Sequence, residues 1–268
     1  MMPGTLRLPW MLVRMGVLVV RGLITLRRFS MRTPAQQQDA IQEWSRRLLH
    51  LCRAQLEVLG EPHKAPCLLA VNHVSWLDIV ALNAAYPTRF VAKADINRWI
   101  LIGTLARGAG TLFIERERPR DAMRVMHAIA QALHSGELIS VFPEGTTSDG
   151  REILPMHANL FQAAISSKAT VQPVLLRYLD ARTGRYSRAP AYVGDETLLG
   201  TLWRMACGGP LRIKIQYLPA VSGDDRRALA SAVRATLQAA LGPQDDAEGE
   251  VLGSEPAPTP LQSSPSSP

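Results

Sequence analysis

The sequence predicts an α/β protein with a mixed, largely buried sheet flanked by helices. Three observations lead to this fold class. After a break at residues 61–66, short apolar runs of strand length alternate with longer stretches of helical periodicity. Some of the runs, such as CLLAV at residues 67–71, are continuously apolar, which is typical of strands covered on both faces. With 268 residues and 47% hydrophobic residues, the chain can bury one sizeable core and is too polar for several membrane spans.

The first element is a strongly apolar stretch at residues 10–26, WMLVRMGVLVVRGLITL. It contains Arg14 and Arg21, whose spacing of almost two helical turns places both on one side of a helix. An arginine at mid-membrane costs roughly 2.5–3.5 kcal/mol, whereas at the interface its guanidinium group reaches lipid phosphates. We therefore expect residues 1–35 to form a helical segment that associates with a membrane surface. A single tilted span and an ordinary amphipathic helix packed on the core are the alternatives.

The folded domain is expected at residues 36–242. Its apolar periodicity predicts a first helix over residues 36–59. Strands are expected at 67–71, 89–93, 110–115, 138–142, 171–178 and 211–218, and further helices near 77–85, 120–134, 159–166 and 224–241. Gly242 and Pro243 end the last helix. Residues 243–268, rich in Pro, Ser and acidic residues, are predicted to be a disordered tail.

The net charge indicates which kinds of binding partner the protein attracts, and the cysteines indicate the redox state of its cellular compartment. The five acidic residues beyond Pro243 leave 30 basic against 18 acidic residues, a net charge of +12, in residues 1–242. Such a body attracts polyanions, including anionic membranes. The three cysteines and six histidines lack metal or redox spacing, so we expect buried thiols, a reduced, cytosol-facing protein and no metal. No basic stretch is interleaved with aromatic residues, which disfavours nucleic acid.

The sharpest local feature is NHVSWLD at residues 72–78, directly after the apolar run CLLAV. If His73 lies in the turn before a helix and Asp78 in its first turn, the imidazole can fold back to the carboxylate. That pair forms a general base held in one tautomer by an acid. Ser75 and Asp78 also match a capping box, so Asp78 alternatively only starts a helix.

A second segment, VFPEGTTSDG at residues 141–150, follows another apolar run. Its glycines let the backbone approach a ligand, and its hydroxyl groups suit phosphate or hydroxyl recognition. An ordinary surface turn is the alternative, since Asp-Gly is common in turns.

NHVSWLD and FPEGT together resemble the first and third motifs of the 1-acylglycerol-3-phosphate O-acyltransferase (lysophosphatidic acid acyltransferase) family, bacterial type. The family's four motifs occur here in order, at residues 72–78, 113–116, 142–146 and 171–174. The resemblance implies the glycerolipid acyltransferase fold and acyl transfer from acyl-CoA or acyl-carrier protein to a lysophospholipid hydroxyl. No cofactor beyond that co-substrate is implied. The cytoplasmic face of the inner membrane is the expected location, in peripheral or single-span form.

The resemblance also assigns roles to particular residues. It makes His73 the general base and Asp78 its partner, and it places Arg116, Glu144, Gly145 and Thr146 in the acceptor site, with Arg116 meeting the phosphate. The supporting residues that it implies are Asn72, Ser75, Pro143 and Pro173, with Pro173 in the wall of the active site.

Two positions depart from the commonest family pattern. Thr147 and His157 stand where that pattern has basic residues. Threonine cannot replace the paired phosphate contact of an arginine. Family members with two threonines in this motif include enzymes for lyso-ornithine lipid or for lysophospholipids with larger head groups. A thioester hydrolase with the same dyad and a catalytically silent membrane-binding protein are the other readings.

Overall fold

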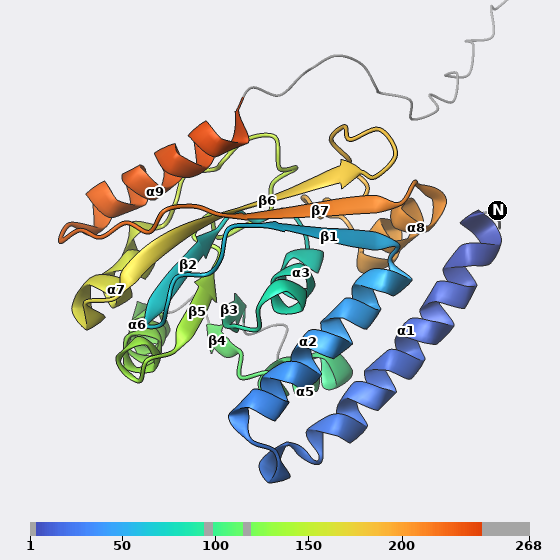
Figure 1. Cartoon of the computed structure of the whole chain (residues 1–268), viewed down its shortest axis with the longest axis horizontal. Coiled ribbons are helices and arrows are strands. Elements are labelled where there is room, and N and C mark those ends of the chain that lie inside the picture. The colour runs from blue at the N-terminus through green and yellow to red at the C-terminus, as the bar shows by residue number, and fades with distance from the viewer. Residues whose placement is uncertain (1–3, 94–98, 115–118, 243–268) are drawn as a thin grey trace, which may run out of the picture.

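The computed structural model describes residues 4–93, 99–114 and 119–242, and within them one mixed sheet lies between layers of helices (Figure 1). The strands are β1 (Ala54–Leu59), β2 (Cys67–Val71), β3 (Arg89–Lys93), β4 (Leu112–Ile114), β5 (Leu138–Val141), β6 (Thr170–Asp180) and β7 (Leu211–Tyr217). The helices are α1 (Gly4–Leu26), α2 (Pro34–Leu51), α3 (Leu77–Ala85), α5 (Ile100–Gly108), α6 (Pro119–His134), α7 (Phe161–Ser167), α8 (Leu198–Cys207) and α9 (Arg226–Leu241), with 3-10 turns η1 (Phe29–Met31) and η2 (Ala158–Leu160). The predicted fold class is confirmed.

The strand order is β1-β7-β6-β2-β5-β3-β4. Neighbouring strands are parallel except for the antiparallel pair β6 and β7. Strand β2 is central, and its alternate residues serve two cores. Cys67, Leu69 and Val71 face the core with α2 and α3, while Leu68 and Ala70 face the core with α6, α7 and α9. This double burial explains why CLLAV is continuously apolar.

The ends of α2 and α9 follow from capping residues. The Thr33 hydroxyl accepts from the Gln36 N–H at 3.3 Å, and Pro34 occupies the first turn, where its missing N–H costs nothing. The Asp225 carboxylate accepts from two backbone N–H groups at the start of α9. Helix α9 ends at Leu241, and the next residue, Gly242, has a φ of 68°; the sequence predicts this end of the helix.

The prediction of one helix over residues 36–59 is wrong beyond Leu51. Arg53 adopts a left-handed φ of 54°, and residues 54–59 form β1, which pairs with β7 in parallel. Tertiary pairing with β7 overrides the helical periodicity here. Two helices that no sequence expectation covers, α5 and α8, pack beside α1.

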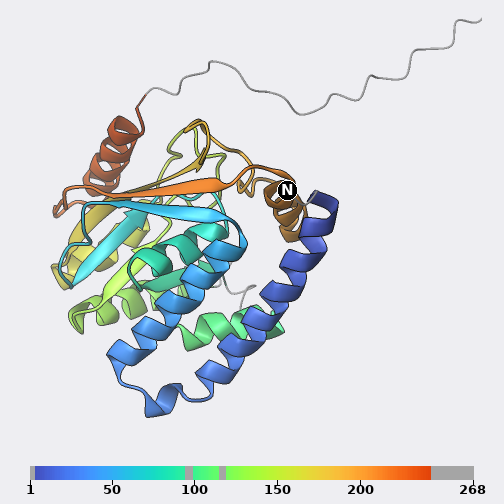
Figure 2. The same cartoon turned by 45° about the vertical axis from the view of Figure 1, so that its right-hand side comes forward.

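Helix α1 lies along the outside of the helical layer, side by side with α2 (Figures 1 and 2). Met11 and Leu18 are buried against the domain, whereas the opposite face of α1 is exposed. The exposed side chains there are Leu6, Trp10, Val13, Val17, Val20 and Ile24. We call these six residues the outer stripe of α1. By length and composition, residues 5–26 are sufficient to cross a membrane, and 17% of the helix's most apolar window is buried in the protein.

Cys52 and Cys67 are buried, as expected, but Cys207 is exposed. Helix α8 buries Leu202, Met205 and Ala206, so the last position of the helix points outward. The expectation of three buried thiols is therefore wrong for Cys207. The tail predicted at residues 243–268 lies outside the described residues.

Candidate active site

The candidate site forms where two neighbouring parallel strands end. The carboxyl ends of β2 and β5 lie at one edge of the sheet because these strands pair in parallel. His73 follows β2, and Phe142 and Glu144 follow β5. The imidazole of His73 stacks on the Phe142 ring with centroids 4.0 Å apart. The two segments that the sequence singled out are thus brought together.

The carboxylate of Asp78 is fully buried and accepts four hydrogen bonds. Its Oδ2 is 2.7 Å from Nδ1 of His73, 2.8 Å from the Val74 nitrogen and 2.9 Å from the Ser75 nitrogen. Its Oδ1 accepts from the Tyr178 hydroxyl at 2.6 Å. The geometry expected from the sequence is present, with Asp78 in the first turn of α3 and His73 in the turn before it.

These bonds fix the tautomer of His73. Because Oδ2 of Asp78 already accepts from the Val74 and Ser75 N–H groups, it is an acceptor toward the imidazole as well. Nδ1 therefore carries the proton, and Nε2 of the neutral ring has a free lone pair. The side chain of His73 is 20% exposed, which leaves the ring open to a substrate. A histidine in this state can take a proton from a hydroxyl group.

The sequence left two roles open for Asp78, as the partner of His73 or as a residue that starts a helix, and the structure combines them. Ser75 is not the N-cap of α3; the helix begins at Leu77 with Trp76 before it, and the Ser75 hydroxyl accepts from the Leu77 N–H at 3.2 Å. The Asp78 carboxylate does accept from the Ser75 N–H, the backbone contact that a capping box would make. The same oxygen holds His73, so the helix start and the imidazole share one anchor.

Asn72 and Glu144 hold the turn that carries His73. Both atoms of the Asn72 amide bond with the backbone of Leu176 in β6, at 3.0 and 2.7 Å. The Glu144 carboxylate accepts from the His73 N–H at 3.0 Å and from the Leu154 N–H at 3.3 Å. Glu144 is only 4% exposed, and burial raises the pKa of its carboxyl group to about 7. In this arrangement Glu144 fixes the His73 backbone.

The turn after β5 presents small and hydroxylated residues. Pro143 is buried, Gly145 has a φ of 75°, and Thr146 is exposed beside the turn. The Thr147 hydroxyl donates to the carbonyl oxygen of Tyr192, so this side chain is turned toward the loop before α8.

The remaining predicted residues lie elsewhere or outside the description. Pro173 is buried within β6, opposite Ala70 in β2, inside the sheet and not at its open edge. Arg116 lies outside the described residues, two positions after β4 ends at Ile114.

Tyr178 is the residue of this site that the sequence analysis missed. Its ring is fully buried, and burial together with the charge of Asp78 raises the pKa of its hydroxyl well above the usual value. The spacing of two residues along β6 could have indicated the position of Tyr178, because alternate residues of a strand face the same side. Val174, Leu176 and Tyr178 share one face of the strand, and that face packs in the same core as α3.

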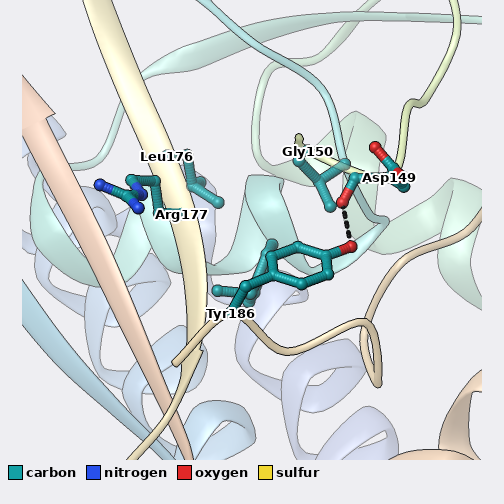
Figure 3. A pocket seen from close by; sticks show the side chains of 7 residues that line it. Asp149, Gly150, Leu176, Arg177 and Tyr186 are labelled. Atoms are coloured by element: carbon teal, nitrogen blue, oxygen red, sulfur yellow. Dashed lines mark hydrogen bonds between the residues drawn. The ribbon is translucent and has the colours of Figure 1, made fainter. Parts of the chain in front are cut away.

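A small cavity lies beside Gly150 and Tyr186 (Figure 3), and Val74, the residue after His73, also lines it. It is lined by Val74, Asp149, Gly150, Leu176, Arg177, Tyr178 and Tyr186, and the Tyr186 hydroxyl donates to the carbonyl oxygen of Asp149 at 2.5 Å. Its volume of about 10 Å³ is room for one water molecule. This cavity is therefore too small to hold a lipid chain.

Comparisons with known proteins place this site in context. The family model described as Acyltransferase matches residues 52–177. A 1-acyl-sn-glycerol-3-phosphate acyltransferase of Neisseria meningitidis is 37% identical, over 88% of this chain and 93% of that protein. A lyso-ornithine lipid O-acyltransferase of Pseudomonas aeruginosa is 36% identical, over 78% of this chain and 80% of that protein.

The same fold occurs in the crystal structure of a 1-acyl-sn-glycerophosphate acyltransferase from Thermotoga maritima. The TM-score is 0.68 at 18% identity, and the match covers 89% of this chain and 94% of that one.

Proposed function

Because the chain belongs to the acyltransferase family, we propose that it transfers a fatty acyl group from acyl-CoA or acyl-carrier protein to the hydroxyl of a lysophospholipid. The first acceptor that we propose is 1-acylglycerol-3-phosphate, which gives phosphatidic acid. The observation that carries the reaction class is the bond of 2.7 Å between Nδ1 of His73, whose side chain is partly exposed, and the buried carboxylate of Asp78.

The reaction is a direct displacement. Nε2 of His73 removes the proton of the acceptor hydroxyl as its oxygen attacks the carbonyl carbon of the thioester. The new C–O bond forms, the C–S bond breaks, and the thiolate leaves. Asp78 stabilises the imidazolium that results. No nucleophile from the enzyme is needed, since both substrates are bound together.

The other residues act around this centre. Glu144 positions His73 through its backbone, because both carboxylate oxygens are engaged by N–H groups of the protein. In the proposed site, Gly145 and Thr146 line the approach of the acceptor; Gly145 has a φ of 75°, and Thr146 is exposed. Arg116 provides the paired phosphate contact in the proposed site.

Lyso-ornithine lipid is the second candidate acceptor, and Thr147 is the observation that favours it. The commonest family pattern has a cation at this position, whereas here the hydroxyl bonds with the backbone of Tyr192. A site with fewer cations discriminates less strongly for a phosphate monoester. The relative from Pseudomonas aeruginosa, named for lyso-ornithine lipid, is 36% identical to this chain.

We further propose that α1 holds the enzyme at the cytoplasmic face of the inner membrane by lying in the interface. The outer stripe of α1 is apolar and exposed, and Arg14 and Arg21 are exposed as well. The guanidinium group of Arg14 lies 4.5 Å from the centre of the Trp10 ring. Helices α5 and α8, which contact α1, add exposed apolar side chains. These are Ile100, Leu101, Ile102, Leu199 and Trp203. Such a surface suits the headgroup region of a bilayer.

An acceptor panel tests the proposed function. Purified full-length protein is given labelled acyl-CoA and, separately, 1-acylglycerol-3-phosphate, lyso-ornithine lipid, a lysophospholipid with a larger head group, or no acceptor. Labelled phosphatidic acid as the main product supports the first acceptor, and acylated ornithine lipid as the main product replaces it with the second. Thiol release that is equally fast without an acceptor would identify a hydrolase instead.

A further inference from the structure

We propose that Tyr178 is a positioning residue of the reaction, the third member of a chain that runs from His73 through Asp78 to Tyr178. This inference rests on the proposed role of His73 as general base. The two oxygens of the Asp78 carboxylate have different hydrogen-bond partners. Oδ2 holds the imidazole and two backbone N–H groups, and Oδ1 accepts from the Tyr178 hydroxyl at 2.6 Å.

Tyr178 is held rigidly, and it bonds with Oδ1 of Asp78, whereas His73 bonds with the other oxygen, Oδ2. The backbone of Tyr178 pairs with Ile213 in the ladder between β6 and β7, and its carbonyl oxygen accepts from the Ser187 N–H at 2.9 Å. The ring is 2% exposed and packs in the core shared by α2, α3 and β7. The hydroxyl therefore cannot follow a moving carboxylate, and it fixes where Oδ1 lies.

A second contact sets β6 in register with the turn that carries His73. Where the pairing of β2 and β6 ends at Val71 and Val174, the Asn72 amide continues it by bonding with both backbone groups of Leu176. Strand β6 is thus tied to the loop at Asn72 and, two residues further along the strand, to Asp78 through Tyr178. Both ties are buried.

The hydroxyl also has an electrostatic effect with a definite sign. Burial and the charge of Asp78 raise the pKa of Tyr178, so the hydroxyl stays protonated and is the donor. Its hydrogen bond stabilises the carboxylate most when the imidazole is neutral and the His73–Asp78 pair carries a full negative charge. Once the imidazole is protonated, the carboxylate has a cationic partner and gains less. Removing this hydrogen bond therefore favours the protonated imidazole over the neutral one.

Strand β7 offers a matched control. Tyr217 packs in the same core and is 7% exposed, but among the described residues its hydroxyl has no hydrogen-bond partner. Tyr178→Phe and Tyr217→Phe each remove one buried hydroxyl from neighbouring strands. Only the first removes a bond to the carboxylate that holds His73.

The experiment compares the two variants with the wild-type full chain in kcat, in both KM values and in the pH dependence of kcat/KM, with melting curves alongside. For Tyr178→Phe we expect kcat to fall roughly tenfold, because Oδ1 of Asp78 is no longer held in place and the imidazole is less well positioned for proton transfer. We expect both KM values to be unchanged, because the residue touches neither substrate. The acidic limb of the pH profile is expected to move to higher pH. Tyr217→Phe is expected to match the wild type.

Two outcomes would overturn the inference. In the first, Tyr178→Phe has the kcat and pH profile of Tyr217→Phe. In the second, kcat falls but the acidic limb stays in place, which is the result of a packing defect alone. His73→Ala, measured in parallel, separates this failure from that of the proposed function. If His73→Ala is active, the proposed mechanism itself is wrong. If His73→Ala is inactive and Tyr178→Phe behaves like the wild type, only the proposed role of Tyr178 is wrong.

Discussion

The Asp78 carboxylate can lose its charge without losing its shape, and Asp78→Asn makes that change. At the Oδ2 position an amide NH2 group would face the fixed N–H groups of Val74 and Ser75, which lie 2.8 and 2.9 Å away. We therefore expect the new side chain to keep its carbonyl oxygen there and to turn its NH2 group toward Tyr178, whose hydroxyl can accept. His73 then keeps its proton on Nδ1.

The expected magnitude follows from what this geometry preserves. The variant loses only the charge that stabilises the imidazolium of His73, and a hydrogen bond to a charged group contributes about 1.5–3 kcal/mol. That corresponds to a kcat roughly 10–100-fold lower. An amide that forces the wrong tautomer costs far more, on the order of 10⁴-fold. Asp78→Ala is the contrasting variant, since it leaves four buried donors without an acceptor and should unfold the loop.

The assay is thiol release from acyl-CoA in the presence of acceptor, with melting curves on the same samples. A wild-type kcat with a lowered melting temperature in Asp78→Asn would show that Asp78 only anchors the loop. A loss near 10⁴-fold would show that the imidazole does change tautomer, and that the N–H groups of Val74 and Ser75 do not fix the amide. Either result refutes the reasoning above.

Other perturbations test the acceptor contact, the membrane face and the buried carboxyl group. Arg116→Lys is expected to raise the KM for a phosphate-headed acceptor but not for the donor, since lysine keeps the charge and loses the paired bonds; unchanged acceptor kinetics would remove Arg116 from the site. Val17 lies on the outer stripe of α1 and is 51% exposed, so Val17→Asp is expected to weaken binding to anionic vesicles. Ala232→Asp, at an exposed position of α9, is expected to leave that binding unchanged. Equal binding by both would exclude the stripe as the membrane contact. Burial raises the pKa of Glu144 from 4.5 to about 7, so this group's stabilisation is fully present below pH 4.5 and is lost as pH rises through 7. The melting-temperature advantage of the wild type over Glu144→Gln should therefore shrink across that window, and a constant difference would contradict this.

Where local pattern and tertiary pairing agree, the sequence was sufficient to predict the fold. The strands β2, β3, β5, β6 and β7 and the helices α3, α6 and α9 match their expected segments closely. Residues 54–59 show the limit. Their apolar residues continue the period of α2, and only pairing with β7 makes them a strand. The local sequence pattern of residues 54–59 cannot predict pairing with a strand that is more than 150 residues away.

The candidate site divides in the same way. His73 and Asp78 are close in sequence, so a turn followed by a helix was sufficient to predict their contact. Glu144 was assigned to the acceptor from the family resemblance, but its carboxylate is turned inward to two backbone N–H groups. Tyr178 was missed because its link to Asp78 spans 100 residues and depends on the register of β6.

The most direct test of the central claim is product formation by the wild type and by His73→Ala, with labelled acyl-CoA and lyso-lipid acceptor. The ring of His73 is partly exposed and stacks on Phe142, so its removal should leave the fold intact, which a melting curve checks. The proposed mechanism predicts that the wild type forms acylated lipid in step with thiol release. It predicts that folded His73→Ala forms none. Acylated lipid made by folded His73→Ala at a rate near that of the wild type would contradict it.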